Sequence, residues 1–275
     1  MKAEAQAGVL PGILREAERR AAEARAARAR LEREAARAGT APDFVAGLAA
    51  GREVAVIAEI KRRSPSAGRL EGAAAGDAAA LARDLEEAGA AALSVLTEPS
   101  HFDGSLEDLA RVAAAVGVPV LRKDFLLDAA QLFEARAAGA AAVLLIARVL
   151  PGERLAELAG VARNLGLACL VEVHAERELE AALACRPEAL GVNARDLDTL
   201  AMDAALVQRL LPRIPAGVLA VAESGLGSRG DVERVAARGA DAVLVGTAVS
   251  GSADPAAALR RLVGVERRGR AERAR

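Results

Sequence analysis

One pattern recurs along the chain from residue 54 onward: a short apolar run, a polar break and an alanine-rich stretch. The runs are rich in leucine and β-branched residues, and several are apolar almost throughout, which is typical of parallel strands buried on both faces. The pattern predicts eight strands, at Val54–Ile60, Ala92–Leu96, Val118–Arg122, Ala142–Ile146, Ala168–Val173, Leu190–Asn193, Val218–Ala222 and Ala242–Val245.

The alanine-rich stretches predict helices, and most of them are followed by a glycine where a helix commonly ends in a left-handed residue. The predicted helices are Gly76–Ala88, Leu106–Ala115, Ala129–Ala138, Glu153–Asn164, Glu176–Ala184, Ala204–Leu210 and Ser228–Arg238. The glycines at their ends are Gly89, Gly117, Gly139, Gly166 and Gly239.

Eight such units close naturally into a TIM barrel, an α/β fold with the helices outside the strands. A doubly wound open sheet is the alternative. That fold usually has fewer strands and carries a dinucleotide-binding fingerprint, which this sequence lacks. We therefore expect a (β/α)8 TIM barrel with an N-terminal helical extension.

The chain of 275 residues is expected to form one domain. Residues 1–50 would form the extension, residues 51–264 the barrel and residues 265–275 a frayed basic tail. Within the extension, residues 11–38 are rich in Ala, Arg and Glu and predict one or two helices. A solvated, salt-bridged surface is the favoured interpretation of these helices, and a lid over one end of the barrel is the alternative.

Charge and composition exclude several classes of partner. The formal net charge of −1 argues against a dedicated nucleic-acid binder. No apolar run is long enough to span a bilayer, and the amino terminus has no signal-peptide core, so we expect no membrane partner. Cys169 and Cys185 lack metal-ligand spacing, and Cys169 lies in an apolar run. We expect a cytoplasmic protein that acts as a monomer, with a homodimer as the alternative.

Lysine is rare in this chain, where arginine supplies nearly all the positive charge. Only Lys2, Lys61 and Lys123 occur, and the last two follow predicted strands. An ammonium group can give up a proton near neutral pH when its pKa is lowered, whereas a guanidinium stays protonated. The two strand-end lysines are therefore candidates for proton transfer.

Barrel enzymes place their chemistry at the carboxyl ends of the strands. Polar residues at these ends are expected in any barrel, and that explanation covers Asp124, Asp196 and Arg148. It fits Glu59 and Glu172 poorly, because apolar residues flank both. The other candidates at strand ends are Lys61, Ser64, Lys123, Asn193, Arg195, Glu223, Ser224, Gly225, Gly246 and Thr247.

A carboxylate inside a buried strand needs a partner of opposite charge. Glu59 and Lys61 lie two residues apart and so share one face of their strand. Two lysines and several carboxylates near one barrel mouth would shift each other's pKa values, as acid–base catalysis requires. A purely structural ion-pair network is the alternative.

The last two strands end in Ser224-Gly225 and Gly246-Thr247. Small residues there let backbone N–H groups approach an anion, and this is the usual phosphate site of such barrels. His101 and His174 show no triad or metal spacing and are interpreted as polar surface residues. No cluster of Cys, His or carboxylate residues predicts a bound metal.

Five motifs follow one another in chain order: Glu59-Ile-Lys-Arg-Arg-Ser-Pro-Ser66, Leu121-Arg-Lys-Asp-Phe125, Leu170-Val-Glu-Val173, Gly191-Val-Asn-Ala-Arg-Asp-Leu197 and Ala222-Glu-Ser-Gly225. Together they resemble the indole-3-glycerol phosphate synthase family of tryptophan biosynthesis, over about residues 42 to 263. The resemblance implies a lyase that cyclises 1-(2-carboxyphenylamino)-1-deoxyribulose 5-phosphate with loss of CO2 and water.

The resemblance also implies roles for individual residues. Lys123 corresponds to the general acid that protonates the ribulose carbonyl, and Glu172 to the base of the later dehydration. Lys61 corresponds to the lysine that faces the anthranilate carboxylate and can donate a later proton. Residues matching groups that orient the lysines and the substrate hydroxyls are Glu59, Asn193 and Glu223, and Arg195 matches a binding arginine.

The remaining matches concern the two ends of the substrate. Ser64, Gly225, Gly246 and Thr247 fall at the family's phosphate-binding positions, and Phe102 and Phe125 at apolar contacts to the anthranilate ring. No cofactor is implied, because the cationic ring intermediate itself accepts the electrons released by decarboxylation. We expect Lys123 to have a lowered pKa, caused by the second lysine nearby.

Two other functions remain open at this stage. One is a different phosphate-binding barrel enzyme, such as phosphoribosylanthranilate isomerase or the tryptophan synthase α subunit. The isomerase would want a cysteine at the end of the first strand, where this chain has Glu59-Ile-Lys61. The other is a non-catalytic barrel that binds a phosphorylated ligand, and the presence of both lysines and Glu172 speaks against it.

Overall fold

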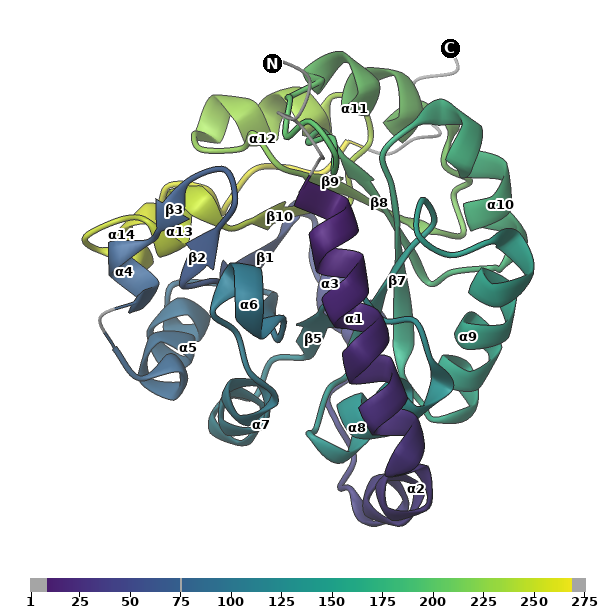
Figure 1. Cartoon of the computed structure of the whole chain (residues 1–275). Helices are drawn as coiled ribbons and strands as arrows, with labels where there is room; N and C mark the ends of the chain where they lie inside the picture. The colour runs from purple at the N-terminus through teal and green to yellow at the C-terminus, as the bar shows by residue number, and fades with distance from the viewer. Residues whose placement is uncertain (1–8, 75, 269–275) are drawn as a thin grey trace, which may run out of the picture.

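Eight parallel strands close into a barrel with helices around it (Figure 1). The computed structural model describes residues 9–74 and 76–268. The barrel strands are β1 (Ala55–Ile60), β4 (Ala92–Leu96), β5 (Val120–Lys123), β6 (Ala142–Ile146), β7 (Ala168–Val173), β8 (Ala189–Asn193), β9 (Leu219–Glu223) and β10 (Ala242–Val245). The barrel closes where β1 pairs with β10, with Ala55 opposite Ala242. The predicted TIM barrel is confirmed.

Most of the helices lie between consecutive strands. Seven of the described helices begin after an Asp or Ser that caps the first turn with its side chain, as at Asp77 and Ser105. The helices are α1 (Val9–Ala26), α2 (Arg28–Arg37), α3 (Phe44–Ala49), α4 (Glu71–Ala74), α5 (Ala78–Glu87), α6 (Pro99–Phe102), α7 (Leu106–Ala115), α8 (Ala129–Ala137), α9 (Gly152–Asn164), α10 (Leu179–Ala184), α11 (Ala204–Leu210), α12 (Arg229–Ala236), α13 (Thr247–Ser250) and α14 (Pro255–Arg260). Short 3-10 turns lie at Glu176–Glu178 and Leu211–Arg213, and a small hairpin pairs β2 (Arg63–Ser64) with β3 (Gly68–Arg69).

The strand and helix boundaries differ little from those expected. Strand β5 begins at Val120, two residues late, because Pro119 has no N–H group to donate to the sheet. The helix predicted at Glu176–Ala184 divides into a 3-10 turn and α10. Four of the five expected glycines adopt positive φ, and Gly117 does not.

Alternation along each strand builds two separate cores. Residues such as Val56 and Ala58 face the helices and join the larger apolar cluster outside the barrel. Their neighbours Ala55 and Ile57 face inward, in a second cluster that fills the barrel interior. Glu59 lies two residues after Ile57 and therefore points to the same inward face of β1. The alternation that packs the barrel interior thus also places polar side chains inside the open end of the barrel, at the carboxyl ends of the strands.

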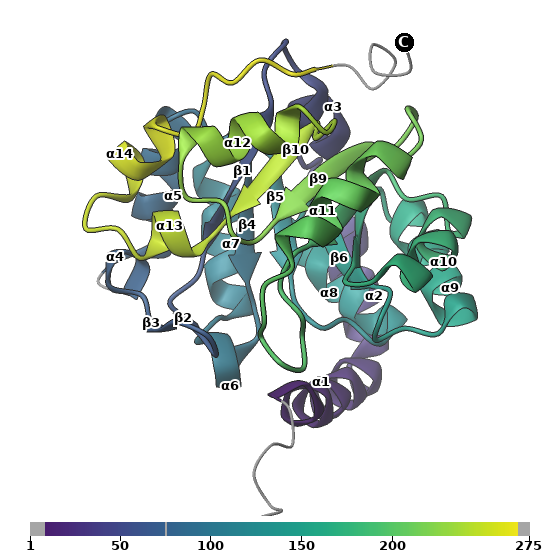
Figure 2. The ribbon, with the colours of Figure 1, turned by 90° about the horizontal axis from the view of Figure 1, so that it is seen from above.

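Helices α1 and α3 close the two ends of the barrel (Figure 2). Phe44 and Leu48 of α3 join the interior cluster at the end where the strands begin. Leu10 and Ile13 of α1 join it at the opposite end. The favoured interpretation of a solvated N-terminal surface was therefore wrong for α1, whose buried face covers part of the mouth.

The end of the chain is more ordered than expected. Val265 is buried, and the Arg267 backbone N–H donates to the Arg52 carbonyl at 2.7 Å. The Arg267 side chain also donates to the carbonyls of Leu48 and Glu53. The expected frayed tail was thus wrong for residues 265–268, and residues 269–275 lie outside the described part. No helix in the described part is both long and apolar enough to cross a membrane.

Candidate active site

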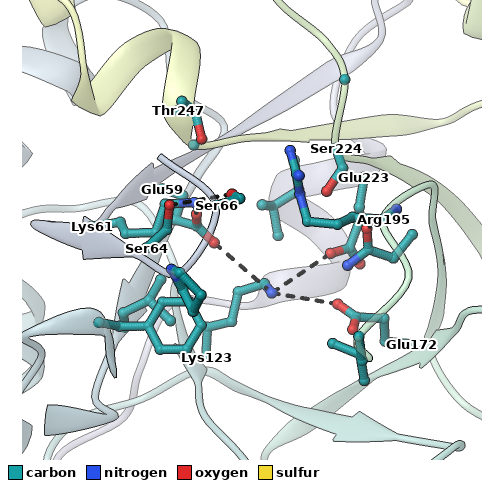
Figure 3. Close-up of a pocket in the computed structure, with 18 of the residues that line it drawn as sticks. Glu59, Lys61, Ser64, Ser66, Lys123, Glu172, Arg195, Glu223, Ser224 and Thr247 are labelled. Carbon is teal, nitrogen blue, oxygen red and sulfur yellow. Dashed lines mark hydrogen bonds and ion pairs between the residues drawn. The ribbon is translucent and has the colours of Figure 1, made fainter. Parts of the chain in front are cut away.

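A pocket of about 520 Å³ opens at the carboxyl ends of the barrel strands (Figure 3). This volume is ordinary for a small-molecule site. Every candidate site residue from the sequence lines it: Glu59, Lys61, Ser64, Phe102, Lys123, Phe125, Glu172, Asn193, Arg195, Glu223, Ser224, Gly225, Gly246 and Thr247.

Lys123 lies among three buried carboxylates (Figure 3). Its Nζ is 3.4 Å from Glu172 Oε2, and 3.9 Å from both Glu59 Oε2 and Glu223 Oε2. Lys61 donates to Glu59 Oε1 at 2.5 Å. Strands β1, β5, β7 and β9 each contribute to this cluster, because the last inward-pointing side chain of each strand is charged.

The charges around Lys123 correct one expectation. Burial by itself lowers the pKa of an ammonium group, but the charges of Glu172, Glu223 and Glu59 outweigh burial and raise the pKa of Lys123. The expected lowering of its pKa by the second lysine was therefore wrong, since Lys61 is already paired with Glu59. In the absence of substrate, Lys123 is held as an ammonium.

The three carboxylates are held in different states. Burial raises the pKa of Glu59, but the nearby lysines outweigh burial and lower it. Burial likewise acts to raise the pKa of Glu172, and Lys123 and His174 reverse this effect. For Glu223, burial and the negative charge of Glu172 act together and raise its pKa well above the usual value. A base and a protonated acid can therefore lie side by side.

Two glycines leave room for the inward carboxylates. A Cβ atom on Gly191 of β8 would lie 2.0 Å from Glu223 Oε1. A Cβ atom on Gly246 would lie 2.2 Å from Glu59 Oε1 and 2.8 Å from Lys61 Nζ. Side chains larger than hydrogen at these positions would displace the charged groups.

Two of the residues expected to bind phosphate lie at the edge of the pocket away from Lys123. Figure 3 shows Ser224 and Thr247 there, at the ends of β9 and β10. Ser224 and Gly225 both have left-handed backbone conformations, with φ of 66° and 71°, so the chain turns sharply after β9. A non-glycine residue in this conformation is often found at a functional site.

Part of the pocket lining is apolar. The rings of Phe102 and Phe125 lie 6.4 Å apart, and Ile13, Leu144 and Ile146 also line this part. This surface suits an aromatic ring. Arg195 also lines the pocket and donates from one Nη to the Leu200 carbonyl. Its loop is held to the segment after β6 by ion pairs of Arg148 with Asp196 and Asp198.

His174 was missed by sequence reasoning. It was interpreted as a surface residue, but it is buried, and its Nε2 lies 2.9 Å from Glu172 Oε1. The available signal was spacing: His174 follows Glu172 by two residues, so the alternation of β7 continued one residue past the end of the strand places both on the inward side. His101 is partly exposed and contacts Glu98, which agrees with the surface interpretation.

A second missed group lies directly behind Lys123. Asp124 was explained as an ordinary polar strand end, but its side chain is fully buried and accepts hydrogen bonds from both Nη atoms of Arg20, at 2.7 and 2.9 Å. It also accepts from Thr97 Oγ1 at 2.6 Å and from Arg122 at 3.2 Å. Helix α1 is thereby joined to β5 next to the central lysine.

The two cysteines of the chain do not line this pocket. Cys169 and Cys185 are free and buried. In residues 9–74 and 76–268, no three His, Cys, Asp or Glu side chains are arranged to hold a metal ion.

Known proteins resemble this chain over most of its length. The sequence profile described as indole-3-glycerol phosphate synthase matches residues 10–262. The synthase of that name from Nocardioides sp. is 53% identical over 211 residues, covering 77% of this chain and 80% of the relative. Indole-3-glycerol phosphate synthase 1 from Streptomyces coelicolor is 49% identical over 233 residues, covering 85% and 86%.

A solved structure supports the fold. The 3-hexulose-6-phosphate synthase from Salmonella typhimurium aligns with a TM-score of 0.61 at 15% identity, covering 76% of this chain and 96% of that one. At this identity the likeness shows the barrel alone.

Proposed function

Because the chain belongs to the indole-3-glycerol phosphate synthase family, we propose that the pocket above its barrel closes the indole ring, with Lys123 and Glu172 as the central acid and base. The enzyme is a carboxy-lyase of tryptophan biosynthesis acting on a phosphorylated small molecule. Its substrate, 1-(2-carboxyphenylamino)-1-deoxyribulose 5-phosphate, loses CO2 and water. The observation that supports these roles best is the position of Lys123 among three buried carboxylates, beside an apolar wall.

In this proposal the substrate lies across the pocket. Its phosphate lies against Ser64, Ser224, Gly225, Gly246 and Thr247, and its aromatic ring against Phe102 and Phe125. Arg195 and Asn193 bind groups between the two ends. Fixing both ends of a flexible substrate brings the ring carbon close to the carbonyl carbon, which supplies much of the rate acceleration.

The first chemical step is ring closure. Lys123 protonates the ribulose carbonyl oxygen as the ring carbon that bears the carboxylate attacks the carbonyl carbon. The negative carboxylates around Lys123 hold its ammonium toward the substrate, since their charges favour the protonated form. The carboxylate of the substrate then leaves as CO2, and its bonding electrons restore the aromatic ring.

Dehydration completes the reaction. The new hydroxyl group leaves as water after taking a proton from Lys61, and Glu172 removes a proton from the neighbouring ring carbon. Glu172 suits this role because its pKa is lowered by Lys123 and His174 in spite of burial, so it is an ionised base at neutral pH. Glu59 orients both lysines.

We also propose that the chain acts as a single-domain monomer in the cytoplasm. The packing of α1 and α3 against the barrel interior supports one domain. The two free, buried cysteines agree with a reducing compartment.

The direct test uses product fluorescence. The chain has no Trp and no Tyr, so indole fluorescence that appears on adding substrate comes from the product. We expect one equivalent of indole product and one of CO2 per substrate at neutral pH. Purified, folded protein that forms neither would contradict the proposed function.

A further inference from the structure

The lysines in the barrel mouth are fewer than the buried carboxyl groups that they contact, and the other basic neighbour, His174, contacts only Glu172 among these groups. Three carboxylates, those of Glu59, Glu172 and Glu223, face two ammonium groups, those of Lys61 and Lys123. The three carboxylates are at most 3% exposed as residues. An uncompensated charge in such a position is costly, and a bound proton is the usual way in which a protein neutralises it.

The contacts indicate which carboxylate holds that proton. Glu59 is paired with Lys61, and the two oxygens of Glu172 face Lys123 and His174. Both oxygens of Glu223 are buried without a hydrogen-bond partner in the described part of the chain. A proton on Glu223 would give it an O–H group to donate to Glu172. Burial and the charge of Glu172 also raise its pKa.

The reaction needs such a proton. The substrate takes up two protons, one at the carbonyl oxygen and one at the departing hydroxyl, and returns one from the ring carbon. Because its carboxylate leaves as CO2, one proton is consumed in each turnover. Lys123 loses the first of these, and a neutral lysine would then face the charges of Glu59 and Glu172.

We propose that Glu223 holds a proton in the resting enzyme and transfers it to Lys123 after Lys123 has protonated the substrate. The Glu223 O–H bond breaks, an N–H bond forms on Lys123, and the ammonium is restored with Glu223 as the carboxylate. The distance of 3.9 Å between Lys123 Nζ and Glu223 Oε2 must shorten by about 1 Å, and catalytic hydrogen bonds commonly tighten when substrate binds. The transfer step rests on the proposed function, whereas the stored proton does not.

Infrared spectroscopy of the substrate-free protein tests the stored proton. At neutral pH we expect a carbonyl stretch of a protonated carboxylic acid that shifts in D2O, disappears at alkaline pH and is absent from Glu223→Gln. It should persist in Glu98→Gln, a control in which another fully buried carboxylate is replaced. A wild-type spectrum without this band at neutral pH, or a band that survives in Glu223→Gln, would overturn the proposal.

Kinetics of Glu223→Gln test the transfer. The amide has the size of the neutral acid and can still donate to Glu172, but it cannot supply the proton. We expect kcat to fall by about 100-fold with little change in KM. In the wild type, kcat/KM should fall as the pH rises through the raised pKa of Glu223, and this alkaline limb should vanish in the variant.

The outcomes separate this inference from the proposed function. If kcat of Glu223→Gln stays within about threefold of the wild type, the proton is not transferred and the inference fails while the synthase activity stands. A wild-type protein that forms no indole would instead remove the proposed function, and the infrared result would still decide whether Glu223 is protonated. If the variant does not fold, the alkaline titration of the wild-type band remains the test of the stored proton.

Discussion

Individual side chains in this pocket are controlled by their neighbours more than by their own chemistry. Lys123 is held charged by the acidic side chains around it, and Glu172 is held charged by Lys123 and His174. Sequence alone could single out Glu59 and Glu172, because a charged residue inside an apolar strand needs a partner. It could not assign the direction of the Lys123 pKa shift, because that depends on which residues from other strands surround the ammonium.

His174 is expected to orient the base. Its Nε2 contacts the oxygen of Glu172 that Lys123 does not contact. His174→Leu removes this contact, so the pKa of Glu172 should rise and the acidic limb of the kcat profile should move to higher pH. We expect a loss of kcat of about 10- to 100-fold near neutral pH. Glu172 acts as an ionised base, so activity is present above its pKa and is lost as the pH falls through it.

His174→Gln is the matched control, since it keeps a polar N–H group beside Glu172. The pH–rate profile by indole fluorescence should return toward the wild type in this variant. Identical profiles for His174→Leu and the wild type would show that the histidine only fills space.

At the scale of elements, the strands were predictable and the role of α1 was not. Each strand shows its own apolar run, whereas the buried face of α1 includes Ala17 and Ala21, which look like the other alanines of that segment. Nothing local marks Arg20 as the partner of Asp124, a residue 104 positions away. Contacts between distant segments carry no local signal.

Arg20→Ala should loosen α1 from the barrel. The variant leaves buried Asp124 with only Arg122, Thr97 and its own backbone neighbour as partners. We expect a loss of about 1–3 kcal/mol in the free energy of unfolding and a several-fold rise in KM, because Ile13 of α1 lines the pocket. Urea unfolding and steady-state kinetics measure the two effects.

Arg30→Ala on α2 serves as the control for this prediction. Arg30 forms an exposed pair with Glu34, and its loss should change neither stability nor KM measurably. Equal effects of the two substitutions would show that the contact with Asp124 does not hold α1 in place.

At the scale of the whole molecule, the barrel results from eight repeats of one strand–helix unit. Eight successive strand–helix units close into one barrel, and the order of the strands in the barrel is their order in the chain. The candidate site residues converge because all strands run in the same direction and end at the same rim. What repetition could not predict is the covering of the rim by α1, since that helix lies outside the repeats.

Stability should fall in acid. Burial acts to raise the pKa of Asp124, but Arg122 and Arg20 outweigh it, and the folded pKa is lowered. The unfolded chain therefore binds protons at higher pH than the folded one, so stability is fully present above about pH 4 and is lost as the pH falls through the folded pKa. Urea unfolding between pH 7 and pH 3 should show this decrease.

Asp124→Asn should be less stable at pH 7, because two arginines lose their charged partner, and its stability should change less between pH 5 and pH 3. The same pH dependence in the variant and the wild type would assign the acid sensitivity to other carboxylates.

The most direct test of the catalytic account is the turnover of Lys123→Arg, followed by indole fluorescence. The guanidinium keeps the positive charge among the side chains of Glu59, Glu172 and Glu223 but is too weak an acid to protonate the carbonyl. We predict that kcat falls by about 1,000-fold or more while KM changes only a few-fold and the protein stays folded. A kcat close to that of the wild type would show that Lys123 is not the acid of ring closure.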